Sequence, residues 1–178
     1  MPGITIHLAI AKEYIKKHSN EIKNEKDFLY GIIEPDLKDG LKVEDKSKTH
    51  YGKWGNYQTQ INLKEFLNDN SVDIELDYYK GYFIHLLTDY YFYNIDFKNE
   101  VDEIRNNNDY FYNDYDATNK TLIEKYNLKI PQNLQKYMGF KDKKTKYLKE
   151  NKLIEFIEKI SNIDIKQQIY MINKQEIL

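Results

Sequence analysis

Three histidines and two aspartates are the side chains of this sequence whose types and spacing favour metal chemistry. His85 and Asp89 stand four residues apart in GYFIHLLTDYYFY (81–93), one of the most apolar stretches of the chain. On a helix, residues four apart project from the same face, so this imidazole and this carboxylate can bind one divalent ion together. His7, Asp36 and His50 offer the same nitrogen and oxygen donors elsewhere. We expect a set of this composition to bind zinc, as one ion or as a pair.

The apolar surroundings of Asp89 need an explanation under any interpretation. A buried carboxylate without a cation costs several kcal/mol or takes up a proton. A protonated His85 on the preceding turn could supply the charge, and an intrahelical ion pair without metal is the simpler interpretation of an isolated His-x-x-x-Asp. The metal hypothesis depends on the other three candidate ligands. The fourth histidine, His18, ends the basic run IKKH and is interpreted as a helix C-terminal residue favoured by the helix dipole.

Composition restricts the classes of protein and of site. The chain has 178 residues, 40% hydrophobic and 31% charged, which is typical of a single folded domain over residues 1–178. The absence of cysteine excludes disulfides and thiolate ligands. A formal net charge of -2 gives no general attraction for polyanions, so stable nucleic-acid binding is not expected. We find no leader peptide and no apolar run of roughly 20 residues, and therefore expect a cytoplasmic protein without a transmembrane segment.

Glycine and proline are scarce, at 7 and 3 residues, and the segments between them have helical periodicity. The sequence therefore predicts an all-α fold, a compact multi-helix bundle with the metal site between its helices. The expected helices span 5–18, 21–33, 57–69, 75–95, the second half of 106–120, a short piece after Pro131, 145–161 and 163–176. Pro35 is expected to end the second of these helices. The polar segment 36–56 is expected to be a long loop.

These elements would carry the candidate ligands to the site from separate parts of the chain. His7 lies in the first helix, Asp36 directly follows the break at Pro35, and His50 lies in the loop. Tyr82, one helical turn before His85, is a candidate to hydrogen-bond a metal ligand from outside the site.

The order of four motifs resembles that of the zinc-dependent phospholipase C family. The motifs are ITIHLAIA, GIIEPD, KTHYG and GYFIHLLTDYYFY, and the resemblance covers about residues 4–95. It implies an all-helical protein that binds a zinc cluster between helices and cleaves phosphodiester bonds in phospholipids; related fungal nucleases with the same cluster cut single-stranded nucleic acid. By position, it implies that one zinc is surrounded by Asp36, His50, His85 and Asp89. It also implies a second site formed by His7, with Asp89 as the bridging carboxylate.

The chain departs from this family after Asp89. Secreted members take a third zinc from two further histidines and a glutamate, but no histidine follows His85 here. The acidic residues that could substitute are Asp96, Glu100, Asp109 and Asp114. We therefore expect one or two zinc ions, with other divalent transition metals as alternatives.

The sequence thus predicts a hydrolase that cleaves a small phosphodiester or phosphomonoester, such as a phospholipid head group or a nucleotide. A divalent ion lowers the pKa of bound water from about 15.7 to about 7. Asp36 is the candidate catalytic residue, because it could both ligate the metal and accept the proton of the water. A non-catalytic metal-binding domain and a protein-interaction domain of the same fold are the alternatives. A phosphohydrolase of the His-Asp class is disfavoured, because the sequence lacks an adjacent His-Asp dipeptide. The substrate and the oligomeric state do not follow from the sequence.

Overall fold

The fold is all-α, as the sequence predicts. The computed structural model describes residues 3–38, 41–42, 45–53, 60–107 and 109–174. Its helices are α1 (Ile4–Lys17), α2 (Glu25–Ile33), α3 (Lys46–Thr49), α4 (Leu63–Asp69), α5 (Asp77–Tyr91), the π-helix η1 (Phe92–Asp96), α6 (Lys98–Asn106), α7 (Tyr112–Tyr126), α8 (Gln132–Gln135), α9 (Glu150–Ser161) and α10 (Ile165–Asn173). Two-residue strands, β1 (Leu37–Lys38) and β2 (Leu41–Lys42), form an antiparallel pair.

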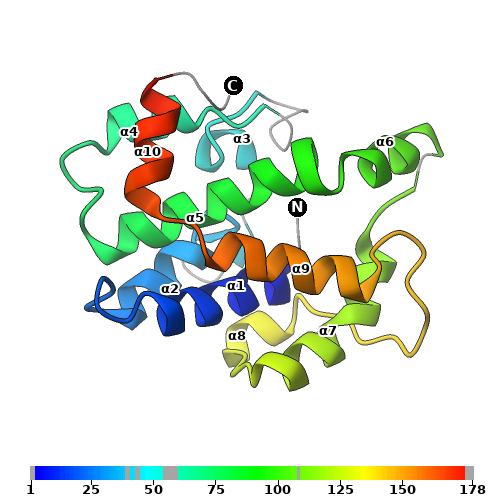
Figure 1. Ribbon diagram of the computed structural model, residues 1–178. Helices are drawn as coiled ribbons and strands as arrows, with labels where there is room; N and C mark the ends of the chain where they lie inside the picture. The colour runs from blue at the N-terminus through cyan, green and yellow to red at the C-terminus, as the bar shows by residue number, and fades with distance from the viewer. Residues whose placement is uncertain (1–2, 39–40, 43–44, 54–59, 108, 175–178) are drawn as a thin grey trace.

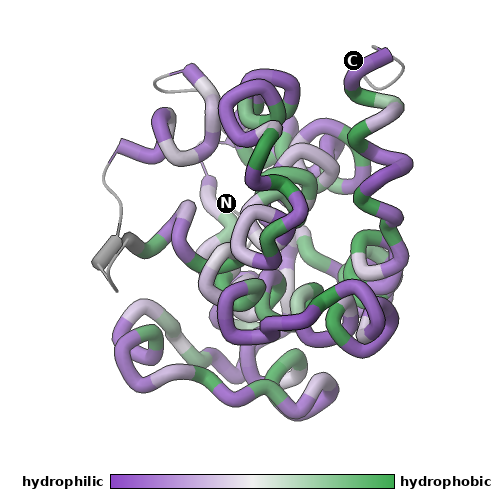
Figure 2. Tube along the Cα trace, turned by 90° about the vertical axis from the view of Figure 1, so that its left-hand side faces the viewer, coloured by the Kyte–Doolittle hydropathy of each residue, from purple (hydrophilic) through white to green (hydrophobic). Residues whose placement is uncertain are grey.

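Helix α5 crosses the middle of the molecule, and the other long helices pack around it (Figure 1). Its most extensive contact is with α2, and α1 in turn contacts α2, α7 and α9. The interior between these helices is filled by aromatic and aliphatic side chains, among them the fully buried Phe28, Phe83, Phe92 and Phe156. Hydrophobic and hydrophilic residues alternate along the helices (Figure 2), as expected for helices that bury one face. Within the described residues, no helix combines the length and the apolar character that a bilayer span requires.

Helices α2 and α5 approach each other closely at two glycines. A Cβ atom on Gly31 would lie 2.0 Å from the carbonyl oxygen of Tyr78, and one on Gly81 would lie 2.1 Å from that of Phe28. Both obstacles are backbone atoms, so no side-chain rotation can relieve the overlap. The crossing therefore requires glycine at both positions, and it sets the position of His85 relative to the end of α2.

Long-range contacts explain why α2 begins later than the sequence predicts. The helix starts at Glu25 and not at residue 21. Asn24 caps it by accepting a hydrogen bond from the amide of Asp27. The carboxylate of Asp77, at the start of α5, accepts hydrogen bonds from the amides of Lys23 and Asn24 and holds them outside the helix.

A buried carboxylate has the same effect on α9, which begins at Glu150 instead of 145. The side chain of Asp114 accepts hydrogen bonds from three successive amides, those of Lys146, Tyr147 and Leu148, at 2.9, 2.6 and 2.8 Å. The segment before α9 is thereby held as a loop against α7.

The turn after α2 is tighter than predicted. The helix ends at Ile33, before Pro35, but Glu34 keeps helical backbone angles (φ -61°, ψ -35°) although a following proline disfavours them. The carbonyls of Ile33 and Glu34 then accept hydrogen bonds from the amides of Asp36 and Leu37. Asp36 is consequently fixed in a turn and does not open a loop.

The prediction that 36–56 is one long loop was wrong for the described part of this segment. Its described part contains the β1–β2 pair and the single turn α3, whose amide at Ser47 is capped by the side chain of Asp45. Other helices also differ from the prediction. The predicted helix 75–95 is α5 followed by η1, α6 was not predicted, and α7 continues to Tyr126. Helix α4 begins at Leu63, after its cap Asn62, and residues 54–59 of the predicted helix lie outside the described residues.

Candidate metal centre

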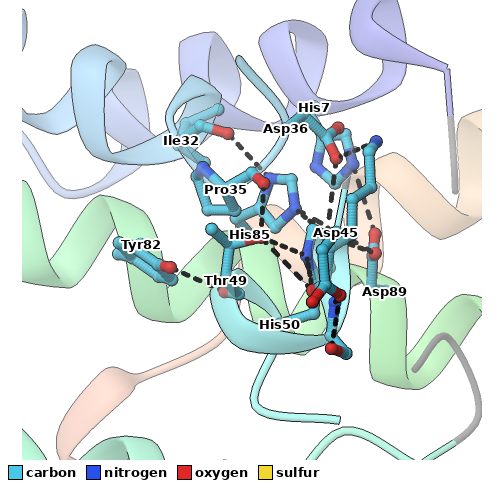
Figure 3. Close-up of polar contacts among 12 residues, drawn as sticks. His7, Ile32, Pro35, Asp36, Asp45, Thr49, His50, Tyr82, His85 and Asp89 are labelled. Carbon is cyan, nitrogen blue, oxygen red and sulfur yellow. Dashed lines mark hydrogen bonds and ion pairs between the residues drawn. The ribbon is translucent and has the colours of Figure 1, made fainter. Parts of the chain in front are cut away.

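Five side chains from separate parts of the chain meet between α1, α2, α3 and α5 (Figure 3). Each has an exposed fraction of 3% or less. They are His7 on α1, Asp36 in the turn after α2, His50 at the end of α3, and His85 and Asp89 on α5. The structure therefore brings together every residue that the sequence proposed as a metal ligand.

Asp36, His50 and His85 each place one donor atom within 4.8 Å of the other two, and Asp89 lies beside His50. The Nε2 atoms of His50 and His85 are 3.1 Å apart. Nε2 of His50 also lies 3.4 Å from Oδ1 of Asp36 and 3.4 Å from Oδ2 of Asp89. Tetrahedral ligands that stand about 2.0–2.1 Å from zinc are about 3.3 Å from one another. The separations from Nε2 of His50 match this spacing, whereas His85 and Asp89 are farther apart, at 4.0 Å. Asp36, His50 and His85 can therefore hold an ion, and Asp89 can join them only if the site contracts.

A second group of possible ligands consists of His7, His85 and Asp89. Nε2 of His7 is 3.3 Å from Oδ1 of Asp89, and the His7 ring stacks on His85 with centroids 4.1 Å apart. The two oxygens of Asp89 thus face different imidazoles, a position from which the carboxylate can bridge two ions. His85 can serve only one ion, because its Nδ1 contacts the carbonyl of Ile32. The two groups therefore share one imidazole that can ligate only one of the two ions.

Several polar atoms of the cluster are buried without a hydrogen bond. Among the described residues, neither ring nitrogen of His7 and neither carboxylate oxygen of Asp89 has a hydrogen-bond partner. The contacts of 3.3 and 3.4 Å between these groups are short enough for ion pairs but do not have the direction of hydrogen bonds. Leaving such a group unsatisfied costs about 1–3 kcal/mol. A bound cation would satisfy both groups, so the donor set fits a metal ion.

Backbone carbonyls orient two of the imidazoles. The carbonyl of Ile32 lies 2.8 Å from Nδ1 of His85, and the carbonyl of Lys46 lies 3.0 Å from Nδ1 of His50. A carbonyl can only accept, so each neutral ring carries its proton on Nδ1 and presents the lone pair of Nε2 to the cluster. This is the arrangement of a histidine that ligates a metal through Nε2.

Burial and neighbouring charges set the protonation of the cluster. Burial lowers the pKa of His85 to about 3, and the adjacent His7 acts in the same direction. Burial would raise the pKa of Asp89, but the imidazoles of His50 and His7 outweigh it and hold that pKa well below its usual value. His85 is thus neutral in the pH range in which Asp89 is ionised, and Nε2 of His85 is 4.0 Å from Oδ2 of Asp89. A simple ion pair between protonated His85 and Asp89 does not describe this geometry.

Asp36 has a partner that sequence analysis missed. Nζ of Lys46 lies 2.7 Å from Oδ1 of Asp36, and Lys46 is 5% exposed. Burial would raise the pKa of Asp36, but the ammonium of Lys46, together with His85 and His50, holds it below its usual value. Lys46 stands four residues before His50 in KSKTH, and this spacing is the signal that could have placed it on the same side of α3.

Tyr82 acts on the backbone and not, as proposed from the sequence, on a ligand side chain. Its hydroxyl donates a hydrogen bond of 2.6 Å to the carbonyl of Thr49, the residue before His50. The hydroxyl of Thr49 donates in turn to the carbonyl of Pro35, the residue before Asp36, at 2.8 Å. Tyr82 and Thr49 therefore join α5 to the two turns that carry Asp36 and His50.

Replacing Tyr82 by Phe removes this hydroxyl and keeps the ring that stacks on Phe66. We expect zinc affinity to fall roughly tenfold, at the lower end of the effect of groups that support metal ligands. Competition with a chromogenic chelator measures the change. Tyr91→Phe is the matched control, because its hydroxyl contacts Gln168 away from the cluster. Equal affinities for Tyr82→Phe and wild type would contradict the expectation.

The acidic residues that could have replaced the third-zinc ligands do not join the two groups of possible ligands among the described residues. Their partners lie elsewhere: Asp96 pairs with Lys159, Glu100 with Lys152, Asp109 with Lys146, and Asp114 binds the amides before α9. The fourth histidine, His18, lies at the end of α1, 3.2 Å from the carbonyl of Ser161. The number of ions stays a prediction from the sequence.

Fold and cluster together define an all-helical protein with a buried centre of three histidines and two aspartates, a composition that can hold divalent metal ions. Comparison of the chain with protein-family models, with curated proteins and with solved structures gives no match. The resemblance to zinc-dependent phospholipases C therefore rests on the order of the four motifs.

Proposed function

We propose that this protein is a metal-dependent phosphoesterase that uses zinc or another divalent transition metal. The observation that carries the proposal is the convergence of five nitrogen- and oxygen-bearing side chains, with donor atoms 3.1–3.4 Å apart, in a buried cluster. The neutral state of His85 and the unsatisfied oxygens of Asp89 support a metal over an ion pair. The order of the motifs supports a phosphoester as substrate.

The residues divide into holding and reacting roles. Asp36, His50, His85 and Asp89 would hold one ion, and His7 with Asp89 would hold part of a second. An ion bound there supplies a Lewis acid that lowers the pKa of coordinated water and polarises a phosphoryl oxygen. The low pKa of Asp36 keeps its carboxylate ionised, as both a ligand and a proton acceptor must be. We propose that the carboxylate of Asp36 accepts the proton that the attacking water releases.

The substrate we propose is a small phosphodiester or phosphomonoester. A depression of about 500 Å³ lies beside α3; Lys48 and Lys53 in its lining would attract a phosphoester, whereas Glu65 and Asp69 would repel it. The cytoplasmic location stays a prediction from the sequence.

A non-catalytic metal site is the second candidate, and the burial of the cluster favours it. Structural zinc sites are closed, whereas catalytic sites keep one position open to water or substrate. His50, His85 and Asp89 have no exposed surface. In this case the ion would stabilise the packing of α1, α3 and α5 without turnover.

Metal content and hydrolysis measured on the same preparations separate these candidates. The protein is purified without chelator, its metals are quantified by mass spectrometry, and bis-p-nitrophenyl phosphate and p-nitrophenyl phosphate are tested as substrates. We expect one or two ions per chain and turnover that chelation removes and zinc restores. His85→Ala should lose both, and His18→Ala, which changes the one histidine outside the cluster, should keep both. Metal without turnover indicates the non-catalytic candidate, and a protein without metal contradicts both.

Zinc affinity is expected to fall as the pH falls below neutrality. Burial would lower the pKa of His50, but its contacts with Asp36 and Asp89 outweigh burial and raise it above the usual 6.5. Below this raised pKa a proton occupies the ring, and zinc must displace it, at a cost of about tenfold in affinity per pH unit for each proton. The effect disappears above the pKa of His50. Chelator competition between pH 6 and 8.5 tests the sign; affinity that rises with acidity would contradict it.

A further inference from the structure

Tyr115 on α7 has a buried hydroxyl group that finds no hydrogen-bond partner among the described residues. The residue as a whole is 8% exposed. A buried phenol normally donates its proton to an acceptor, so this group needs an explanation. His7 and Asp89 in the candidate metal centre also have buried polar atoms without a hydrogen bond. The position of Tyr115 relative to these two residues is therefore of interest.

The ring of Tyr115 packs against the beginning of α1, one helical turn before His7. The amide of His7 bonds to the carbonyl of Gly3, and a Cβ atom on Gly3 would lie 3.2 Å from the Tyr115 ring. One turn further along α7, Asn119 accepts a hydrogen bond of 2.7 Å from the hydroxyl of Thr5. Side chains of a helix lean toward its N-terminus, so the His7 ring leans toward the end of α1 that Tyr115 covers.

The charge of Asp89 reaches the hydroxyl of Tyr115. Burial is the largest cause that raises the pKa of this phenol, and the carboxylate of Asp89 comes next. Asp89 acts on it more strongly than Asp114 does, although Asp114 directly precedes Tyr115 in the chain. The phenol thus stays protonated close to Asp89, without a hydrogen bond to it among the described residues. Its O–H group can only be satisfied by a further acceptor beside this carboxylate.

We propose that the hydroxyl of Tyr115 donates a hydrogen bond to a water molecule or hydroxide on the metal ion that His7 and Asp89 would hold. Such an oxygen supplies the acceptor that the phenol lacks, and the ion satisfies His7 and Asp89 at the same time. Tyr115 is then a positioning residue that fixes one coordination position from outside the set of ligands. The inference rests on the proposed function because it requires a metal ion in this centre, but it does not require hydrolysis.

Zinc affinity measured by chelator competition tests the role of the hydroxyl. Tyr115→Phe keeps the ring and removes only the hydroxyl, and we expect it to bind zinc about tenfold more weakly than wild type. Tyr14→Phe is the matched control, because the hydroxyl of Tyr14 is also buried without a partner, but the charges that act on it are those of Glu21 and Asp164. This control should bind zinc as wild type does.

A double-mutant comparison separates a role at the ion from a general effect on the fold. If His7 and Tyr115 act on the same ion, their effects on zinc affinity are not additive. We therefore expect Tyr115→Phe to cause no further loss of affinity in a His7→Gln background.

Thermal unfolding provides a readout that does not depend on the affinity measurement. In chelator, the hydroxyl of Tyr115 lacks an acceptor, so Tyr115→Phe should melt at or above the temperature of wild type. In excess zinc, the rise in melting temperature should be smaller for Tyr115→Phe than for wild type, because weaker binding stabilises less. A variant that melts below wild type in chelator, or does not fold, would show that the hydroxyl has a partner within the protein and would overturn the inference.

The outcomes distinguish this inference from the proposed function. Equal zinc affinities of wild type and Tyr115→Phe overturn the inference alone. A further loss of affinity in the His7→Gln background also overturns it alone, since the hydroxyl then acts elsewhere. The absence of zinc binding by wild type overturns both.

Discussion

Asp89→Asn is expected to leave the protein without bound zinc and to lower phosphoester hydrolysis by at least about 1000-fold. The two oxygens of Asp89 face two imidazoles, His7 at 3.3 Å and His50 at 3.4 Å. The amide keeps the volume of the side chain but removes the negative charge that both possible ions need. Metal catalysis contributes several kcal/mol to the transition state, and each 1.36 kcal/mol corresponds to about tenfold in rate.

The experiment compares metal content and turnover of Asp89→Asn with those of Asp114→Asn. Asp114 is also a buried carboxylate, at 4% exposure, but its oxygens bind the backbone amides before α9. The control therefore reproduces the loss of a buried charge without touching the candidate ligands. Asp114→Asn should retain metal and turnover per folded molecule. Zinc content equal to that of wild type in Asp89→Asn would remove the central argument for the metal centre.

Gly31→Ala and Gly81→Ala are each expected to destabilise the protein by at least about 3 kcal/mol, the upper range for overpacking of a core. Alanine ordinarily stabilises a helix relative to glycine by about 1 kcal/mol. Here the added Cβ would meet backbone oxygens at 2.0 and 2.1 Å, so α2 and α5 must separate. For a chain of this length, the loss corresponds to a decrease of roughly 6–12 °C in melting temperature.

Thermal unfolding followed by circular dichroism, in the presence of chelator, measures this effect without a contribution from bound metal. Gly139→Ala is the matched control, because its Cβ would meet the carboxyl group of Asp116, at 2.4 Å, and this side chain can rotate away. Its melting temperature should change little. Zinc affinity should also fall in Gly31→Ala and Gly81→Ala, because the crossing of α2 and α5 sets the distance from Asp36 to His85. A melting temperature at or above that of wild type for Gly31→Ala would mean that the helices do not cross this closely.

The sequence determined the helical fold class and the members of the candidate site. Helical periodicity is a local property, so α1, α2 and α5 were predicted with errors only at their ends. The spacing of His85 and Asp89 is fixed by helix geometry. The boundaries of α2 and α9 were not predictable, because the side chains that hold the preceding amides, Asp77 and Asp114, come from distant segments.

Only the tertiary structure decided how the site is arranged. The crossing of α2 and α5 at Gly31 and Gly81 places Asp36 within reach of α5, and the hydrogen bond from Tyr82 to the carbonyl of Thr49 holds the turn of His50 against the same helix. No local pattern encodes these distances. Burial then makes His85 neutral and keeps it from being the counter-ion of Asp89. Lys46, which lies in a segment that reads as a solvated loop, became part of the site because the chain folds back over α5. Residue types can be read along the chain, but distances, burial and charge balance arise from packing between segments that are remote in sequence.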